Sequence, residues 1–252
     1  MHYVGIDIGS TASKVSVFDD EDLLSNFVMP TGWSSVDTSN KIKEELMKKG
    51  IDFEKAKVVA TGYGRISVPY ADKTITEITC HGKGAYYLYN SPMMTVVDIG
   101  GQDTKIINME NGNVTNFLMN DKCAAGTGRF LELMANTLGV NLDEMANMAL
   151  KGKDINITSM CTVFAESEVI SLIGSGAKRE DIARGVINSI IGRIKTLLNK
   201  QGIQGDIYLT GGLCDLDPLI QLLSKKINRE VKTCPLARYA GSIGGALLAK
   251  NI

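Results

Sequence analysis

Near its N-terminus the chain reads Asp7-Ile8-Gly9-Ser10-Thr11-Ala12-Ser13-Lys14, and the pattern returns as Asp98-Ile99-Gly100-Gly101-Gln102-Asp103-Thr104-Lys105. Each copy lies between two apolar runs, which predicts a strand, a tight turn and a second strand. Turns rich in glycine and serine let backbone N–H groups converge on phosphate oxygens. The repeat therefore predicts two related lobes holding one polyphosphate. Asp7 and Asp98 are then placed for Mg²⁺, which prefers oxygen ligands beside phosphates.

The rest of the chain alternates strand and helix patterns around these two turns. A hairpin, a third strand and then strand–helix alternation, occurring twice, predict a mixed sheet with covering helices in each lobe. We expect the lobes to be residues 1–91 and 92–252, with the C-terminal helix, 239–250, joining the first. Strands are expected near 3–8, 14–18, 23–28, 58–60, 94–99, 104–109, 113–118, 206–210 and 231–233. Helices are expected near 38–49, 77–90, 128–139, 142–151, 162–174, 179–201, 217–228 and 239–249.

Composition excludes several classes of partner. Hydrophobic residues make up 44% and charged residues 22% of the chain, and a net charge of −1 gives no reason to expect nucleic acid or an anionic membrane. No apolar stretch reaches the roughly 18 residues that cross a bilayer. A strand pattern begins at Tyr3, which leaves no room for a signal peptide. We therefore expect a cytoplasmic protein.

Two of the five cysteines lie where thiol chemistry is expected. The odd number and irregular spacing argue against a disulfide framework or a zinc ribbon, so Cys80, Cys214 and Cys234 are expected to be buried thiols. Cys123 and Cys161 each precede a helix, whose N-terminus stabilises a thiolate or an anionic centre. An iron–sulfur cluster needs four thiolates, which two copies of the chain related by a two-fold axis would supply. The alternatives are two buried thiols, or one thiol that senses redox state.

Other motifs narrow the nucleotide site. The chain lacks a Walker sequence, and Gly126-Thr127-Gly128 lacks the third glycine of a dinucleotide fingerprint. Leu209-Thr210-Gly211-Gly212-Leu213 predicts a strand end on which an adenosine lies against bare backbone. Glu166 is either a helix N-terminal carboxylate or a nucleotide-site residue.

Basic side chains are less informative. Lys14 and Lys105 follow the phosphate turns and are either phosphate ligands or exposed strand ends. His2 and His81 match no catalytic triad and are expected to be structural or exposed to solvent.

These motifs together resemble a known family. The two Asp-Ile-Gly turns and Thr210-Gly211-Gly212 are similar to the superfamily of acetate and sugar kinases, heat-shock chaperones and actin. Ala60-Thr61-Gly62-Tyr63-Gly64-Arg65, residues 120–130 around Cys123, and residues 161–170 after Cys161 look like the activator, or component A, of 2-hydroxyacyl-CoA dehydratases. That group includes the ATPase subunits of benzoyl-CoA reductase. The resemblance covers nearly the whole chain.

The resemblance implies an actin-like ATPase fold of two ribonuclease-H-like lobes with mixed five-stranded sheets. It also implies a homodimer with one 4Fe–4S cluster held by Cys123 and Cys161 of each subunit. ATP with Mg²⁺ would bind each chain, and hydrolysis to ADP would drive one electron to the dehydratase (component D) or a related double-cubane protein. Reduced ferredoxin or flavodoxin would be the electron donor.

The expected site residues follow from these motifs. Asp98 and Gln102 are the expected catalytic residues, because a glutamine beside a phosphate orients an attacking water. Asp7 and Asp98 are expected to hold Mg²⁺, directly or through water. The expected nucleotide contacts are Asp7, Gly9, Ser10, Thr11, Ala12, Ser13, Lys14, Gly100, Gly101, Gln102, Asp103, Gly126, Thr127, Gly128, Arg129, Glu166, Gly211, Gly212 and Leu213.

Two other classes of function stay open from the residues. One is a small-molecule kinase of the same superfamily, in which the cysteines are incidental. The other is a nucleotide-dependent binding module that changes shape for a partner. Iron content separates the electron-transfer activator from both. The acyl-CoA is not encoded here, since the activator contacts the dehydratase and not its substrate.

Overall fold

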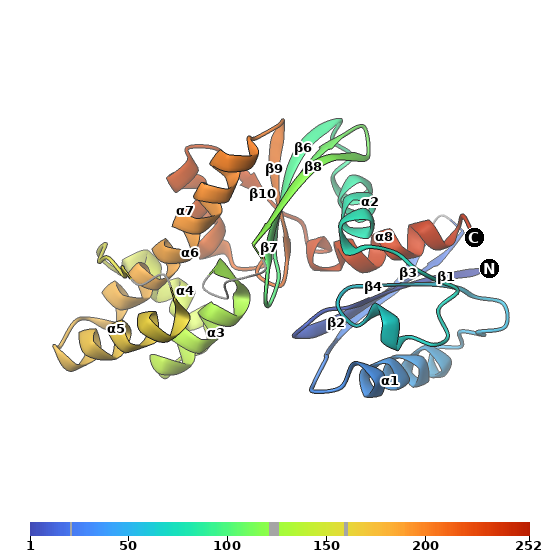
Figure 1. Ribbon diagram of the computed structural model, residues 1–252, viewed down its shortest axis with the longest axis horizontal. Helices are drawn as coiled ribbons and strands as arrows, with labels where there is room; N and C mark the ends of the chain where they lie inside the picture. Colours follow the sequence, from blue (N-terminus) through green and yellow to red (C-terminus); the bar gives the residue numbers. More distant parts are fainter. Residues whose placement is uncertain (21, 121–125, 159–160) are drawn as a thin grey trace. The chain divides into compact units, whose positions relative to one another are not determined.

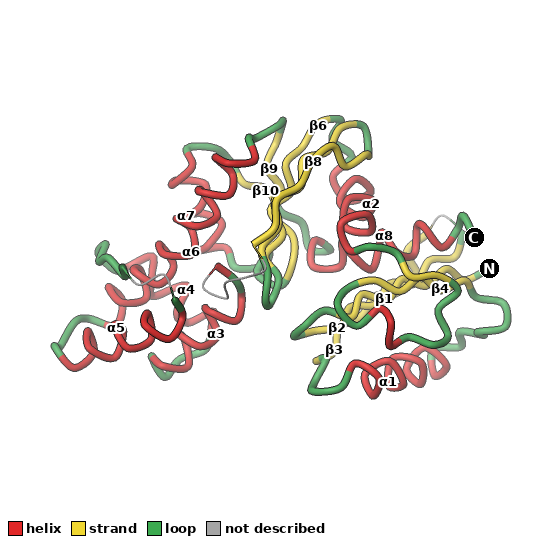
Figure 2. The backbone as a smooth tube through the Cα atoms, viewed as in Figure 1, coloured by secondary structure: helices red, strands yellow, loops and turns green. Residues whose placement is uncertain are grey.

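The computed structural model describes residues 1–20, 22–120, 126–158 and 161–252, and the chain divides into two compact units (Figures 1 and 2). The first unit contains Met1–Met93, Met109–Thr115 and Cys234–Ile252. The second contains Met94–Asn108 and Asn116–Thr233. No helix in the described part of the chain combines the length and the apolar composition needed to cross a membrane.

The first sheet has five strands in the order β3-β2-β1-β4-β5. Strand β1 pairs antiparallel with β2 and parallel with β4, and Asp7 lies opposite both Lys14 and Thr61. The sheet is therefore mixed, as predicted, with the first Asp-Ile-Gly turn at the end of its central strand. The strands are β1 (His2–Ile8), β2 (Ala12–Asp19), β3 (Asp22–Pro30), β4 (Lys57–Thr61) and β5 (Lys73–Thr74).

The second sheet repeats this plan. Its order, β10-β9-β6-β7-β8, is the same arrangement read from the other edge, with β6 in the place of β1. Strand β6 pairs parallel with β9, and Asp98 lies opposite Thr210. The strands are β6 (Met93–Ile99), β7 (Thr104–Glu110), β8 (Asn113–Asn120), β9 (Asp206–Gly211) and β10 (Val231–Lys232).

Helices cover the sheets in both units. In the first, α1 (Ser35–Lys48) lies on one face of the sheet, and α2 (Glu77–Tyr89) and α8 (Ala240–Ala249) lie on the other (Figure 1). Because both faces are covered, the centre of β1 is buried throughout. The second unit has α3 (Gly128–Thr137), α4 (Leu142–Lys151), α5 (Thr162–Gly174), α6 (Arg179–Gln201) and α7 (Asp217–Ile227).

Glycine lets α8 pack directly against backbone in the first unit. A Cβ added at Gly244 would lie 1.7 Å from the carbonyl oxygen of Cys80 in α2, and one at Gly5 would lie 1.9 Å from that of Ser242 in α8. No side chain fits at such separations, so α8 approaches both β1 and α2 at the distance that glycine allows. The C-terminal helix is therefore fixed to the strand that carries Asp7.

The predicted elements agree closely with the structure. The strands expected near 104–109 and 113–118 are confirmed as β7 and β8, and Asn111-Gly112 between them has the φ angles of a type I′ turn, 48° and 80°. Helix α1 begins at Ser35 and not near residue 38, because the side chain of Ser34 accepts a hydrogen bond from the backbone N–H of Asp37. The two-residue strand β5 was not predicted.

Replacing Gly244 with Ala is expected to destabilise the first unit by about 2 kcal/mol or more, because the new methyl group meets backbone that cannot move aside. The measurement is urea unfolding followed by circular dichroism. Gly192→Ala in α6 is the matched control, since nothing lies within 4 Å of its Cβ position, and alanine there is expected to be neutral or stabilising by up to about 1 kcal/mol. Equal midpoints for the two variants would contradict the close packing of α8.

Candidate functional site

The first turn connects β1 to β2, and Thr31, which follows β3, holds the turn in shape. Asp7 is buried at the end of β1. Thr31 donates its hydroxyl to the carbonyl oxygen of Gly9 at 2.8 Å, and its Oγ1 lies 2.9 Å from Oγ of Ser13. The backbone N–H of Thr31 also bonds the carbonyl oxygen of Thr11 at 3.0 Å. Residues 9–13, predicted to bind phosphate, therefore form an ordered turn.

Glycines surround the buried carboxylate of Asp7. A Cβ at Gly62, whose φ is +82°, would lie 2.5 Å from Oδ1 of Asp7, and one at Gly241 would lie 2.7 Å from Oδ2. The backbone N–H of Gly64 bonds the carbonyl oxygen of Ile8 at 2.9 Å. The carboxylate thus lies against bare backbone on two sides, which fixes its position.

The second turn also has a buried aspartate near the end of a central strand, and it adds a second carboxylate beside the lysine. Asp98, Asp103 and Lys105 are buried, and Nζ of Lys105 lies 3.2 Å from Oδ2 of Asp98 and 2.6 Å from Oδ1 of Asp103. Thr210 donates its hydroxyl to Oδ1 of Asp98 at 3.1 Å. Two carboxylates share one ammonium group, so this cluster has one negative charge in excess. Lys105 is therefore an ion-pair partner of Asp98 and not an exposed strand end.

The two copies of the turn differ at this point. Asp103 of the second copy corresponds to Ala12 of the first, so Lys14 has no equivalent of the second carboxylate in its own turn. The second turn, with its excess negative charge and carboxylate oxygens, fits a divalent cation such as Mg²⁺. The first turn, with one lysine for one aspartate, fits phosphate oxygens.

Three predicted motifs meet in the second unit. The start of α3 is bonded to the second turn: the N–H groups of Gly128 and Arg129 bond the carbonyl oxygens of Gly100 and Gly101 at 2.9 and 3.0 Å. Thr104 donates its hydroxyl to the carbonyl oxygen of Gly126 at 2.5 Å. The third motif, residues 209–213, lies beside the other two, since a Cβ at Gly128 would lie 3.8 Å from the side chain of Leu213. Thr127 is fully buried between them.

Gly211 and Gly212, at the end of β9, make the same contacts with the second turn that Gly62 and Gly64 make with the first. Gly211 has a φ of +87°, and a Cβ there would lie 2.6 Å from Oδ1 of Asp98. The N–H of Gly212 bonds the carbonyl oxygen of Ile99 at 3.0 Å. Gly62 and Gly64 were not among the predicted site residues. The Thr-Gly pair shared by residues 61–62 and 210–211 is the sequence signal that identifies Gly62.

The remaining predicted nucleotide contacts lie in different surroundings. Gln102 is exposed on the second turn, where it is open to water. Arg129 is 68% exposed and pairs with Glu132 at 3.2 Å. Glu166 lies in α5 and accepts a hydrogen bond of 3.4 Å from Thr137, the last residue of α3, so it connects these two helices. His81, expected to be structural or exposed, is buried in α2.

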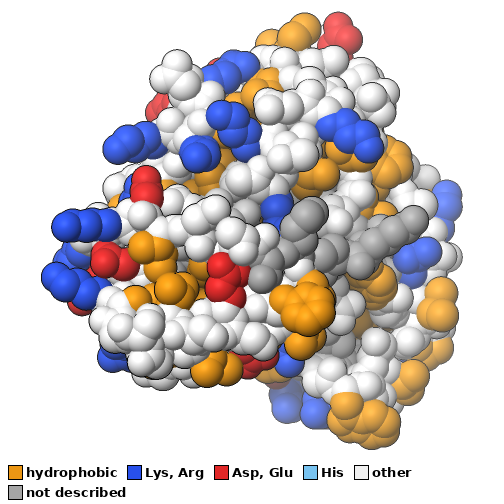
Figure 3. All heavy atoms as spheres, turned by 60° about the vertical axis from the view of Figure 1, so that its left-hand side comes forward, with side chains coloured by type: hydrophobic (Ala, Val, Ile, Leu, Met, Phe, Trp, Pro, Cys, Tyr) orange, Lys and Arg blue, Asp and Glu red, His pale blue; other side chains and the backbone are white. Residues whose placement is uncertain are grey.

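Cys161 is the exposed thiol of the described residues, and it is the N-cap of α5. Its carbonyl oxygen accepts the N–H of Ala165 at 2.9 Å. Val163 and Phe164, just after it, are 65% and 68% exposed, and Figure 3 shows hydrophobic side chains exposed on the side of the molecule brought forward. An exposed thiol at a helix N-terminus fits a metal centre shared with a second chain. Cys123 lies outside the described residues.

Two of the other cysteines fit the expectation of buried thiols, and Cys234 does not. Cys80 and Cys214 are fully buried, and Cys234 is partly exposed. Burial, and to a lesser degree the neighbouring Asp7 and Glu77, raises the pKa of Cys80 to about 12, against a smaller lowering by its hydrogen bond with Thr61. A raised thiol pKa means that Cys80 stays protonated, and therefore unreactive, across the physiological range.

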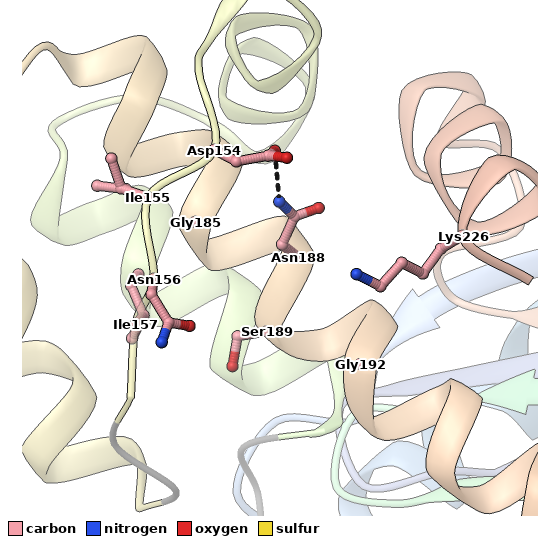
Figure 4. Close-up of a pocket in the computed structure, with 9 residues that line it drawn as sticks. All are labelled: Asp154, Ile155, Asn156, Ile157, Gly185, Asn188, Ser189, Gly192 and Lys226. Atoms are coloured by element: carbon pink, nitrogen blue, oxygen red, sulfur yellow. Dashed lines mark hydrogen bonds between the residues drawn. The ribbon is translucent and has the colours of Figure 1, made fainter.

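A pocket of about 300 Å³ lies in the second unit away from the predicted motifs (Figure 4). The segment before α5 lines one wall and α6 the other, with Lys226 of α7 at the side. Asp154 bonds both Asn188 and Arg184 of α6 at 2.9 Å, which holds this segment on the helix. We assign the pocket no ligand.

Residues 4–249 match a family described as the BadF/BadG/BcrA/BcrD ATPase family. The chain belongs to this family. It is 43% identical to the (R)-2-hydroxyglutaryl-CoA dehydratase activating ATPase of Acidaminococcus fermentans, over 99% of this chain and 97% of that protein. The crystal structure of component A of that dehydratase superposes with a TM-score of 0.93 at 42% identity, covering 100% of this chain and 98% of that one.

A second solved relative is the activator of the 2-hydroxyisocaproyl-CoA dehydratase from Clostridium difficile with bound ADPNP. It matches with a TM-score of 0.92 at 38% identity, over 100% of this chain and 95% of that one. Family membership makes the chain an ATPase and confirms the expected actin-like ATPase fold with two mixed five-stranded sheets. The predicted resemblance to the dehydratase activators is likewise confirmed.

Replacing Lys105 with Met is expected to destabilise the second unit by about 3 kcal/mol or more, because two buried carboxylates lose their shared cation. Chemical unfolding at neutral pH measures this change. Lys55→Met is the control, since Lys55 pairs with Asp52 at the surface and is 82% exposed, so its removal should change stability little. Similar stability of both variants would mean that the buried ion pairs are not formed.

Alkylation should distinguish the cysteines in iron-free protein. At pH 8, iodoacetamide is expected to modify the exposed Cys161 while Cys80 reacts at least about 100-fold more slowly, because a pKa of about 12 leaves little thiolate. Peptide mass spectrometry after timed quenching gives both rates. In urea the two rates should become similar. Rapid modification of Cys80 in the folded protein would show that α2 does not bury it.

Proposed function

We propose that this ATPase is an activator that donates single electrons, driven by ATP hydrolysis, to a 2-hydroxyacyl-CoA dehydratase or a related reductase. The observation that carries the proposal is the exposed thiol of Cys161 at the N-terminus of α5, in a chain with two phosphate-type turns. Relatives of 39–43% identity are named as dehydratase activators, and another is named as one of the subunits of a benzoyl-CoA reductase. Hydrolysis alone would need no exposed thiol at this position.

ATP and ADP are proposed to bind at both turns, with the N–H groups of residues 9–13 and 100–103 on phosphate oxygens. Mg²⁺ is proposed to bind at the carboxylate-rich second turn through Asp98, and at Asp7, directly or through water. The buried excess charge of Asp98, Asp103 and Lys105 supports this assignment. Bare backbone at Gly211 and Gly212 would accept the adenosine. The remaining predicted contacts, with Arg129 and Glu166, stay part of this proposal.

The chemistry of hydrolysis is assigned to the second turn. Gln102 is exposed there, so its amide can orient a water molecule for attack on the terminal phosphate. Asp98 is fixed by Thr210 and Lys105 and is proposed to hold the metal that neutralises charge on the leaving oxygen. Transfer to water yields no phosphorylated product, in contrast to a kinase of the same fold.

A 4Fe–4S cluster shared by two copies of the chain is proposed to accept and pass the electron. Cys123 and Cys161 of each copy would supply the four thiolates. The exposed apolar side chains of Val163 and Phe164 beside Cys161 favour burial against a second chain. We further propose cytoplasmic location, ferredoxin or flavodoxin as the donor, and a dehydratase component or double-cubane protein as the acceptor.

Hydrogen bonds in the second unit suggest how the nucleotide affects this centre. The start of α3 is bonded to Gly100 and Gly101 of the second turn, and Thr104 bonds Gly126 just before the helix. At its other end, Thr137 of α3 bonds Glu166 of α5, the helix that Cys161 begins. A change at the turn on hydrolysis would therefore shift α3 and through it α5. The dipole of α5 is one term in the electrostatics of a centre at its N-terminus.

Anaerobic purification with iron and sulfide analysis tests this proposal. We expect about four iron and four sulfide per dimer. Cys161→Ser should lose most of both while still binding ATP, because the thiol is remote in sequence from both turns. Cys123→Ser should behave in the same way. Iron-free, colourless wild-type protein that phosphorylates a sugar or a carboxylate would refute the proposal in favour of a kinase.

A further inference from the structure

The segment that leads to Cys161 is attached to α6 over its first part. The N–H of Lys153 bonds Oδ1 of Asp181 at 2.7 Å, and Asp154 bonds Arg184 at 2.9 Å. Ile157 is buried, and a Cβ at Gly185 would lie 3.2 Å from its side chain. These contacts explain why residues 152–157 are ordered on α6. They do not fix the end of the segment that approaches the thiol.

That end is held by α5 itself. The backbone N–H of Thr158 lies 3.1 Å from both Oε1 and Oε2 of Glu168, and its hydroxyl lies 3.2 and 3.4 Å from the same two oxygens. A carboxylate that accepts both donors of one residue forms the charge-assisted kind of hydrogen bond, which is stronger than a neutral one. Glu168 therefore fastens the backbone three residues before Cys161.

From these contacts we infer that Glu168 is a positioning residue for the Cys161 thiolate. Cys161 begins α5, with its carbonyl oxygen bonded to Ala165, and Glu168 bonds Thr158 from within the same helix. Thr158, the described residue that precedes the thiol, is thereby bonded to the helix that Cys161 begins. A shift of α5 would carry Thr158 and Cys161 together, which would preserve the position of the sulfur relative to Thr158. This inference rests on the proposed function, in which Cys161 is a metal ligand.

Besides holding Thr158, the Glu168 carboxylate brings a negative charge near the N-terminus of α5. Glu168 is within the first two turns of α5, whose N-terminus carries partial positive charge. A negative charge at this place opposes the dipole at the thiol. Geometry and charge are separable, because glutamine keeps an oxygen that accepts the N–H of Thr158 and loses the charge.

The experiment compares Glu168→Ala and Glu168→Gln with wild-type protein and with Glu45→Ala. The control removes a glutamate that pairs with Lys49 at the surface of α1. Three readouts are taken. The first is hydrogen–deuterium exchange of the peptide that contains Thr158, in iron-free protein. The others are the rate at which a chelator removes iron from the loaded dimer and the electron paramagnetic resonance spectrum of that dimer.

We expect Glu168→Ala to exchange and to lose iron at least about tenfold faster, as the loss of a charge-assisted hydrogen bond implies, with an altered resonance spectrum. Glu168→Gln keeps the acceptor and loses the charge, so both of its rates should lie between those of Glu168→Ala and wild type, and Glu45→Ala should match wild type. Faster exchange without any change in iron loss or spectrum would make Glu168 structural only and overturn the inference. Unchanged exchange would also overturn it. Absence of iron in wild-type protein would instead count against the proposed function.

Discussion

A buried aspartate beside a glycine is the constraint on which both turns depend. Asp7 and Asp98 each lie one residue before the end of the central strand of their sheet, and the neighbouring parallel strand leads to Gly62 or Gly211 against the carboxylate. Both glycines have positive φ, and any side chain there would overlap a carboxylate oxygen and a carbonyl oxygen. The aspartate is thus fixed by backbone on the adjoining strand, before any ligand binds. Everything proposed for nucleotide and metal at these turns depends on that fixation.

The second unit adds a mechanical connection to this arrangement. Helix α3 begins on the turn itself, through hydrogen bonds from Gly128 and Arg129, and it ends at the Thr137–Glu166 contact with α5. Backbone bonds of this kind permit little slippage, so a displacement of the turn is passed along a helix to the element that Cys161 caps. Each contact in this series belongs to one compact unit. The connection therefore does not require the two units to act on each other.

Local patterns predicted much of the fold, because periodicity and turn chemistry are local properties. The hairpin at Asn111-Gly112 and the extent of α5 and α6 follow directly from residue spacing. Contacts made across the fold were not predictable in this way. Lys105 resembles an exposed strand end in sequence, and only the folded sheet shows it between two carboxylates. Glu168 is one of several charged residues near Cys161, and its bond to Thr158 depends on how the chain returns along α5.

One of the differences between the two turns, alanine at position 12 against aspartate at position 103, gives the two lysines different surroundings. Lys105 is buried and lies between two carboxylates, whereas Lys14 is only partly buried. The same position of the repeat is therefore an interior ion-pair partner in one unit and open to solvent in the other. For this reason the two halves of the repeat are not interchangeable, although their backbone plan is the same.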